Sequence, residues 1–538
     1  MSRAFAVWGA VLAMFIVTTS IYGGYRFFSP IPYWDQWDGY IGVYKVLKQG
    51  AYQVFWAQHM EHRLVLASAI FWLDIVAFGG WNIFTLVLNY LMLAGIGIAI
   101  FNEYHRGRTV EHSPWLIGGI IFGFLFLWCQ NENLKWGFQV ESIMVYLFSA
   151  LAFAHFSRPD NRILNITAAL VLATLAMLSM GNGIVAFFVM AIQGLLLRRP
   201  WKESAIATVA GCIGSVIYFH DYIKYPLPIN PDVANLPFAQ VKFFLMFLGN
   251  AAFFVRSDLR LIAALGILSL GVAAIMVFWL FWKREITPYR SFLIANYGMI
   301  VAAAMGASRN RWMLGLAASA ASRYTTPVLI GYVVLALLGS DIAPRRLRIA
   351  AAGIPLALMT YLAVYQMQAF SDNSYLYNWK LAVLGQKIGL DHPELDALIF
   401  PAEFHSRYID NANFAAAQNI GPYGRGWLHD AGIVKYDPAK RDDLLCLGAL
   451  EPVHADASGT AAGGWMIDHG AGSSLIVLTD DSGQTVGYGV TGASRPDVRR
   501  AVPGAPSNAG WKGFAHYAGN LSAYAYVDGK FCRLPAVR

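Results

Sequence analysis

The chain has 538 residues, of which 57% are hydrophobic and only 13% charged. Its mean hydropathy is +0.46, whereas an average soluble domain carries about 25% charged residues. This composition excludes a water-soluble globular protein. The formal net charge of +8 does not indicate nucleic-acid binding either, because the arginines gather in short clusters between apolar runs, where they set membrane topology.

The first apolar run, residues 4–22, has no clear small-x-small cleavage site, and further apolar runs follow it. We therefore interpret it as a retained anchor and not as a signal peptide. Clusters of Lys and Arg recur between the later runs, and loops of this kind face the cytoplasm. These basic segments are Arg3, 102–113, 157–162, 198–202, 283–290 and 344–348.

If all these loops face inward, two apolar segments cannot cross the membrane. They are 64–78, which carries Asp74 in its middle, and 238–255, which carries Lys242. We expect both to lie in the outer interface or to re-enter it, where such charges are tolerated. About eleven spans remain by this rule. They lie near residues 4–24, 81–101, 115–129, 139–156, 164–180, 184–197, 204–219, 261–282, 291–306, 324–340 and 349–366.

After residue 366 the composition changes, and everything beyond it lies on the outer side in this topology. Residues 1–366 form the predicted transmembrane module, 367–440 an extracytoplasmic helical linker region, and 441–538 a small β-sandwich. The predicted fold is thus an α-helical polytopic membrane protein with a C-terminal extracytoplasmic α+β domain. Hairpin turns are expected at Asp481-Ser482-Gly483 and at Asp528-Gly529.

Two of the four cysteines, Cys446 and Cys532, lie in this polar C-terminal region. They can form a disulfide if the region faces an oxidising compartment. Free thiols are the alternative, and the sequence does not decide between the two.

The stretch PYWDQWDGY, residues 32–40, follows the first apolar run and contains Asp35 and Asp38. On a helix this spacing places both carboxylates on one face, and beside a bilayer they need water, a cation or a partner. One interpretation is a general base beside Trp34 and Trp37 as platforms for a sugar. The other is an interfacial loop with hydrated aspartates and a belt of aromatic rings.

A second polar cluster, His59-Met60-Glu61-His62-Arg63, lies in the same outer loop. It lacks the HExxH spacing of a convincing zinc site. We expect instead a salt bridge from Glu61 to Arg63 or Lys45, with a histidine hydrogen-bonded to an acid. In the functional interpretation Glu61, His62 and Arg63 contact the acceptor.

Residues 130–139 join two predicted spans with far more polar groups than a tight hairpin needs. Amides, an acid, a lysine and a tryptophan are suited to holding a sugar, and Asn182, between two glycines, can add another amide. The alternative is helix capping and anchoring at the interface. The candidate substrate-binding residues here are Asn131, Glu132, Lys135, Trp136 and Gln139.

Arg309, Arg311 and Arg323 precede a predicted span on the outer face, against the usual charge distribution. They require something negative nearby. A lipid phosphate or pyrophosphate fits, because a guanidinium matches phosphate oxygens with forked donors, and Tyr324 stands next to Arg323. The alternative is a salt bridge to a carboxylate in the same outer layer.

This arrangement resembles the GT-C superfamily of membrane glycosyltransferases: an acidic motif after the first span, interfacial helices, many spans and a soluble outer domain. Bacterial lipid-linked sugar transferases related to protein mannosyltransferases and aminoarabinose transferases are the most similar group, and the likeness covers residues 1–366. It implies a bacterial inner-membrane enzyme with a periplasmic active site that uses a polyprenyl-phosphate-linked sugar. The acceptor is then a glycan, lipid or protein, and the C-terminal domain is similar to sugar-binding β-sandwiches.

The resemblance also places Asp35 or Asp38 at the catalytic acid. Mannosyltransferase-like members often carry adjacent Asp and Glu, whereas here Gln36 follows Asp35, so either aspartate can be the base. The expected reaction is inverting, with Asp35 as first choice for the base and with the late arginines and Lys135 facing the carrier phosphate.

No metal or cofactor is required, although a divalent cation bound by Asp35, Asp38 and Glu61 is an alternative. The main rival is a lipid or glycan flippase. It is disfavoured because the span interiors carry almost no charge and the sequence shows no repeated halves. A non-catalytic assembly or sensor protein is disfavoured too, because so many spans exceed what anchoring needs.

Overall fold

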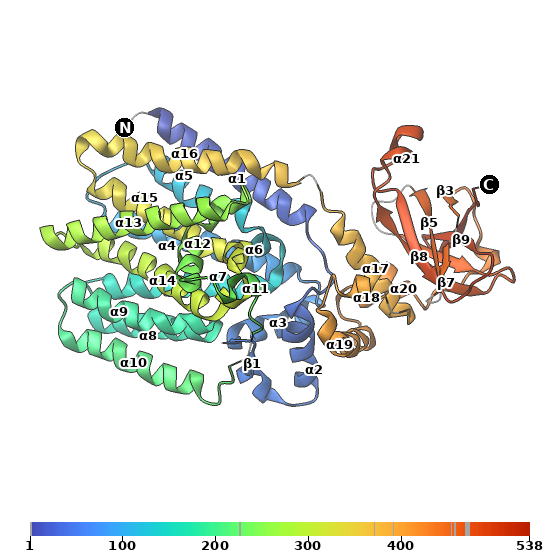
Figure 1. Ribbon diagram of the computed structural model, residues 1–538, viewed down its shortest axis with the longest axis horizontal. Helices are drawn as coiled ribbons and strands as arrows, with labels where there is room; N and C mark the ends of the chain where they lie inside the picture. The colour runs from blue at the N-terminus through green and yellow to red at the C-terminus, as the bar shows by residue number, and fades with distance from the viewer. Residues whose placement is uncertain are drawn as a thin grey trace. The chain divides into compact units, whose positions relative to one another are not determined.

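A computed structural model describes residues 3–224, 227–370, 372–390, 392–452, 454–456, 459–468 and 474–537 (Figure 1). The chain divides into two compact units. The first, which we call the helical unit, comprises Met1–Phe28, Phe55–Ile70 and Ile83–Ser371. The second, which we call the sheet unit, comprises Ser29–Val54, Phe71–Asn82 and Asp372–Arg538. The sequence does not predict that two segments from near the N-terminus belong with the C-terminal part.

Among the described residues, nine helices are long and apolar enough to cross a membrane, which indicates an integral membrane protein. All nine coincide with predicted spans. The other two predicted spans, 184–197 and 204–219, also form helices, α9 (Val185–Leu196) and α10 (Trp201–Phe219). The nine are built on α1 (Arg3–Arg26), α4 (Ile83–Gly107), α5 (Pro114–Leu125), α7 (Val140–Ser157), α8 (Arg162–Ser179), α13 (Leu259–Lys283), α14 (Pro288–Arg311), α15 (Thr325–Ile342) and α16 (Arg348–Gln366).

The two segments predicted not to cross form short helices. They are α3 (Val65–Phe78), with 14 residues, and α12 (Ala239–Leu248), with 10. A helix rises 1.5 Å per residue, so crossing a bilayer takes about 20 residues. Both helices are therefore too short to span the hydrocarbon.

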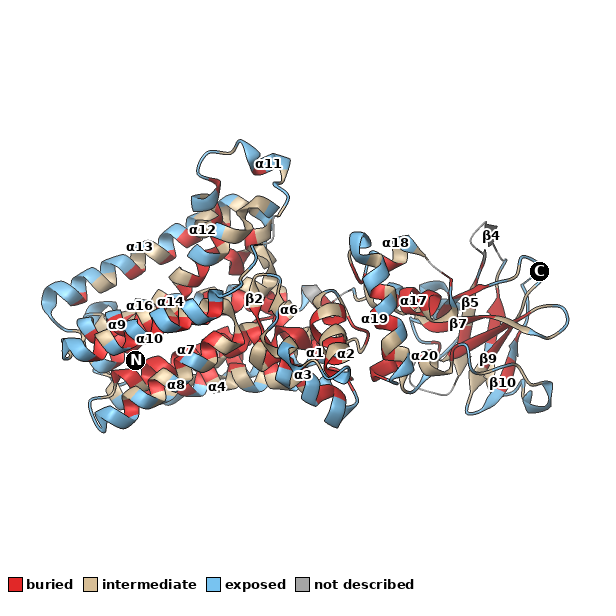
Figure 2. Cartoon of the chain, turned by 90° about the horizontal axis from the view of Figure 1, so that it is seen from below, coloured by how far each residue is buried: buried red, intermediate tan, exposed pale blue. Residues whose placement is uncertain are grey.

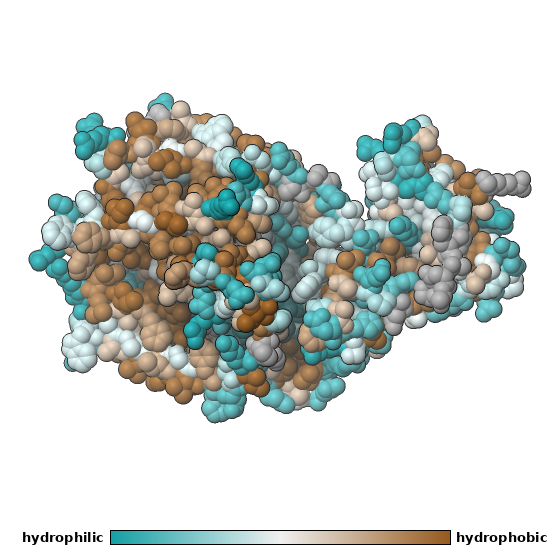
Figure 3. All heavy atoms as spheres, in the orientation of Figure 1, coloured by the Kyte–Doolittle hydropathy of each residue, from teal (hydrophilic) through white to brown (hydrophobic). Residues whose placement is uncertain are grey.

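The surface of the helical unit is apolar over much of its area, as expected for contact with lipid. Figure 3 shows hydrophobic side chains gathered over this part of the molecule. Helix α13 illustrates the pattern (Figure 2), because only a stripe along one face is buried while the rest is exposed or half-buried. The stripe comprises Ile262, Gly266, Ser269, Ala273 and Leu280.

Small residues let α12 and α13 approach until their backbones touch. A Cβ atom at Gly266 would overlap the carbonyl oxygen of Leu245 on α12, and main-chain atoms cannot move aside cheaply. Close approach at small residues is a common way for helices to associate in membranes, where burying apolar surface gives no drive.

We therefore expect Gly266→Ala to lower the stability of the helical unit by about 2 kcal/mol, the cost of overpacking a tight contact. Thermal unfolding in detergent, followed by loss of the monodisperse peak, would measure this. Gly271→Ala on the same helix is the matched control, since a Cβ there meets no heavy atom within 4 Å. Equal midpoints for the two variants would contradict the packing argument.

The sheet unit contains one antiparallel sheet of eight strands among its described residues, in the order β10-β9-β6-β7-β8-β5-β3, with β4 also paired to β5. Both expected hairpin turns are confirmed. Asp528 and Gly529 join β9 to β10, and both have a positive φ. Gly483, in the turn between β6 and β7, also has a positive φ. The strands are β3 (Cys446–Leu450), β4 (His454–Asp456), β5 (Gly459–Asp468), β6 (Leu475–Thr479), β7 (Thr485–Ala493), β8 (Gly510–Ala515), β9 (Ser522–Val527) and β10 (Lys530–Leu534).

This sheet curls until its two end strands meet, so it differs from the predicted sandwich of two stacked sheets. Leu450 of β3 donates its N–H to Pro535 O at 2.9 Å and accepts from Val537 N at 2.8 Å. The Cys446–Cys532 disulfide joins the same two edges, which answers the open question of pairing. Side chains from several strands, including Trp511, Ile476 and Leu534, fill the inside of the curl.

The outer face of the curled sheet is covered by α17 (Tyr375–Ile388). The Tyr377 hydroxyl lies at the centre of this contact. It donates to Val490 O at 2.8 Å and accepts from Lys512 N at 2.7 Å. The helix and the sheet are therefore one folded unit.

Candidate functional site

Ion pairs tie together the loops that the charge rule assigns to the cytoplasm. Arg158 binds Glu103 at 2.8 Å, Arg290 binds Asp341 at 2.8 Å, and Arg162 pairs with Glu203. These contacts place the basic loops of the helical unit at one end of its bundle, as the sequence predicts. The other polar segments of the helical unit, which contain Glu132, Arg311 and Arg323, adjoin the opposite ends of these helices.

At that other end, two of the late arginines have carboxylate partners. Arg311 Nη2 lies 2.5 Å from Glu61 Oε2, and Arg323 Nη1 lies 3.3 Å from Glu132 Oε2. Their positive charge is therefore compensated within the helical unit, which is the alternative that the sequence left open. Arg309 is exposed, and no ion pair holds it among the residues described.

The cluster 59–63 folds as a two-stranded hairpin, β1 (Gln58–His59) and β2 (His62–Arg63). The expected partner of Glu61 was wrong: Glu61 pairs with Arg311, Lys45 pairs with Asp410, and Arg63 binds carbonyl oxygens. The Arg63 guanidinium donates to the carbonyls of Trp56, Tyr218 and His220, at 2.5 to 2.8 Å. These hydrogen bonds fix the β1–β2 hairpin to the end of α10, so the Arg63 guanidinium already donates to main-chain carbonyls.

The Gly-Asn-Gly sequence forms the helical turn η5 (Gly181–Ile184) between α8 and α9. Asn182 Nδ2 donates to the Tyr146 hydroxyl at 3.4 Å. A Cβ atom at Gly181 would lie 2.9 Å from the Tyr218 hydroxyl and 3.2 Å from His62 Nδ1. The structure thus places Asn182 beside Tyr146, and Gly181 beside Tyr218 and His62.

Glu132 and Asn133 bind the start of α15 and the residues just before it. Asn133 Nδ2 donates to Arg323 O at 3.1 Å and to Thr326 Oγ1 at 2.6 Å, and the Glu132 amide donates to Ser322 Oγ at 3.0 Å. Asn131 begins the short helix α6 (Asn131–Lys135). These contacts join the segment 130–139 to residues 322–326.

The other predicted residues of this region lie in packed surroundings. The Lys135 ammonium lies 5.7 Å from the Phe27 ring centroid, and Trp136 stacks on Phe138 at 5.5 Å. Gln139 is buried, and the Tyr324 ring packs against Phe247 at 5.1 Å. Trp136 is half-buried, so part of its side chain remains accessible.

The acidic segment belongs to the sheet unit and has an unusual backbone. Trp34 has a φ of +48°, and η1 (Trp37–Gly42) is a turn of π-helix that leads into α2 (Val43–Lys48). Asp35 is half-buried beside Trp34, which is 43% exposed. Trp37 is fully buried with its ring 4.9 Å from Tyr408. Of these two tryptophans, Trp34 is accessible to a sugar and Trp37 packs in the core.

Helix α19 (His405–Ala417) holds Asp38. Arg407 Nη1 lies 2.8 Å from Asp38 Oδ2, and Asn411 Nδ2 donates to Asp38 Oδ1 at 3.3 Å and to Trp37 O at 2.8 Å. The Arg407 guanidinium also lies over the Phe404 ring at 4.9 Å. The pairing of Asp38 with Arg407 could not be predicted from the sequence, because the two residues are 369 positions apart.

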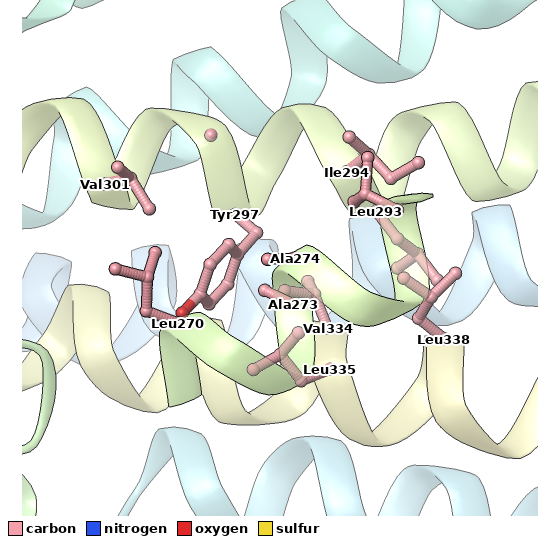
Figure 4. A pocket seen from close by; sticks show the side chains of 12 residues that line it. Leu270, Ala273, Ala274, Leu293, Ile294, Tyr297, Val301, Val334, Leu335 and Leu338 are labelled. Carbon is pink, nitrogen blue, oxygen red and sulfur yellow. The ribbon is translucent and has the colours of Figure 1, made fainter. Parts of the chain in front are cut away.

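An apolar cavity of about 260 Å³ lies among α13, α14 and α15 in the helical unit (Figure 4). Its one polar side chain is Tyr297, whose hydroxyl is 2.8 Å from Ser269 Oγ. A hydrocarbon chain suits such a lining. The other labelled residues are Leu270, Ala273, Ala274, Leu293, Ile294, Val301, Val334, Leu335 and Leu338.

Among the described residues, no group of three or more His, Cys, Asp or Glu side chains is arranged to hold a metal ion. Comparison with known proteins found no matching family, no matching curated protein and no matching solved structure.

Proposed function

We propose that the chain is a GT-C-type membrane glycosyltransferase that moves a sugar from a polyprenyl-phosphate carrier to an extracytoplasmic glycan, lipid or protein. The observation that carries the proposal is the environment of the acidic segment. Within a few residues it offers the half-buried carboxylate of Asp35, the exposed ring of Trp34 and the Asp38–Arg407 pair. A base, a stacking surface and a guanidinium are the groups that transfer from a sugar phosphate needs.

In the proposed reaction Asp35 takes the proton from an acceptor hydroxyl. The acceptor oxygen then attacks the anomeric carbon, the bond from that carbon to the phosphate oxygen breaks, and the phosphate leaves with the electron pair. Asp38 is the second candidate for the base, and its two oxygens accept hydrogen bonds from Arg407 and Asn411. Base catalysis of this kind contributes about 10²- to 10⁴-fold to the rate.

The departing phosphate needs positive charge. In the unit that contains the acidic segment, the Arg407 guanidinium beside Asp38 can meet this charge. In the helical unit, Arg309 is a separate candidate for binding a lipid phosphate, because Arg311 and Arg323 are paired with Glu61 and Glu132. Guanidinium groups stabilise the charge that develops on a leaving phosphate. The cavity among α13, α14 and α15 would accept a short part of the polyprenyl chain.

The proposed location is the bacterial inner membrane, with the sheet unit in the periplasm. The Cys446–Cys532 disulfide supports this side, because disulfides persist in oxidising compartments and are rare in the cytosol. The basic loops are gathered at one end of the helical unit, which agrees with a cytoplasmic position of that end.

The experiment is transfer by purified protein in liposomes that contain a radiolabelled polyprenyl-phosphate sugar. Label that moves from the organic phase into a water-soluble or lipid-linked product would support the enzyme. Label that stays on the carrier but changes leaflet would identify a flippase. No transfer and no movement with any of several acceptors would refute the proposal.

A further inference from the structure

Asp74 is an acid in the middle of the apolar helix α3, and the proposed reaction does not use it. Its side chain is completely buried. The Tyr40 hydroxyl donates to Asp74 Oδ2 at 2.6 Å, and the Asn82 N–H donates to the same oxygen at 3.2 Å. Asp74 Oδ1 has no hydrogen-bond partner among the described residues.

The hydrogen bonds continue from Asp74 to the acidic segment. Asn82 Oδ1 accepts from Gln36 Nε2 at 2.9 Å, and Gln36 Oε1 accepts from the Tyr33 N–H at 3.0 Å. Gln36, Tyr40 and Asn82 are each at most 3% exposed. Asp74 is therefore linked to residues 33, 36 and 40, which bracket both Asp35 and Asp38. We call this chain of bonds the Asp74 network.

Such a network is costly, since a buried polar group loses its water and a buried charge loses more. Burial also raises the pKa of Asp74 above that of an ordinary aspartate, although the hydrogen bonds from Tyr40 and Asn82 oppose this. A leucine at position 74 would avoid the cost and suit the helix as well. The cost of burying Asp74 therefore suggests that its hydrogen bonds have a role that an apolar side chain cannot take.

The Asp74 network adjoins a stretch of unusual backbone. Trp34 has a positive φ and residues 37–42 form a π-helical turn. A positive φ in a residue other than glycine is costly and persists only where the surroundings fix it, and π turns are frequent at functional sites. Trp34 lies between the hydrogen-bonded residues Tyr33 and Gln36, and the hydrogen-bonded Tyr40 lies within the π turn.

We infer that Asp74 is a positioning residue, which acts through Tyr40, Asn82 and Gln36 to hold the Asp35 carboxylate in the geometry needed for proton transfer. Asp74 itself touches no substrate. The inference rests on the proposed function for its catalytic part, but the positioning of residues 33–42 is measurable without any reaction.

Asp74→Ala removes the acceptor, Tyr40→Phe removes only one donor, and Asp74→Asn keeps an oxygen that can accept both bonds. We expect kcat for transfer to fall about 10- to 100-fold in Asp74→Ala, as misplaced catalytic groups do, with KM within about threefold. Asp74→Asn should keep kcat within about threefold of wild type. Tyr44→Phe is the matched control, because the Tyr44 hydroxyl makes no hydrogen bond among the described residues.

Amide hydrogen exchange of the full-length protein in nanodiscs gives the second readout. Residues 33–42 should exchange faster in Asp74→Ala and Tyr40→Phe, and at the wild-type rate in Asp74→Asn and Tyr44→Phe. If Asp74→Ala does not fold, Tyr40→Phe decides. Wild-type exchange in this segment for the variants that break the network would overturn the inference. Absent transfer by the wild type, with the expected exchange pattern, would refute the proposed function and leave the positioning role supported.

Discussion

Asp35→Asn should reduce glycosyl transfer by about 10²- to 10⁴-fold, the range that a positioned general base contributes. The amide keeps the shape of the side chain but cannot accept the proton, so KM should change little. Asp38→Asn should cost less than about tenfold, because it removes an ion pair whose Arg407 side chain is 55% exposed, and such pairs contribute about 0 to 1 kcal/mol. Initial rates with labelled carrier-linked sugar would measure both.

Asp410→Asn is the control for this pair of variants. Asp410 lies on the same helix, α19, as Arg407, and it pairs with Lys45 of α2. Its loss removes an acid and an ion pair but no group assigned to the reaction, so transfer should be unchanged. Undiminished transfer in Asp35→Asn would exclude it as the base, and a larger loss in Asp38→Asn would exchange the two roles.

Hydropathy and charge were sufficient to locate the helices, because burial in lipid requires long apolar runs and the basic loops flank them. The nine long helices and the short α3 and α12 follow from this. Packing between helices does not, since it depends on single small residues such as Gly266. The inclusion of residues 29–54 and 71–82 in the sheet unit also depends on contacts across hundreds of residues.

The sequence was sufficient to single out the acidic residues of the candidate site. It was not sufficient to identify the residues that pair with them. Asp35 and Asp38 stand out in sequence because carboxylates beside an apolar run are rare. Arg407 does not, because an arginine in a polar helix is ordinary, and only the fold brings it to Asp38. For the same reason the sequence left open whether Arg311 and Arg323 meet a lipid phosphate or a carboxylate, and the structure pairs them with Glu61 and Glu132.

Strand positions and turns were readable from alternation and from Asp-Gly pairs, but the closure of the sheet was not. Whether an antiparallel sheet stacks on a second sheet or curls on itself depends on the register at its edges. Here glycines such as Gly464 and Gly513 allow the tight curl, since a Cβ atom at either would overlap a carbonyl oxygen of the neighbouring strand. The seam between β3 and β10 then brings Cys446 to Cys532.

Replacing both Cys446 and Cys532 by Ser should destabilise the sheet unit by about 4 to 5 kcal/mol, the loop entropy expected for a crosslink between cysteines 86 residues apart. Loss of the crosslink frees the last strand, β10, from the β3 edge, where only a few main-chain hydrogen bonds remain. Amide exchange in β3, β9 and β10 should accelerate about 10³-fold, since each 1.4 kcal/mol is a factor of ten.

Cys212→Ser is the matched control, because Cys212 is an exposed free cysteine on α10 in the helical unit. It should leave exchange in the strands unchanged. Reduction of the wild type under mild conditions should reproduce the double variant, which separates the effect of the bond from that of the serines. If strand exchange in the double variant stays at the wild-type rate, the closed sheet is stable without its crosslink. The disulfide would then report the compartment of the sheet unit and contribute nothing to its stability.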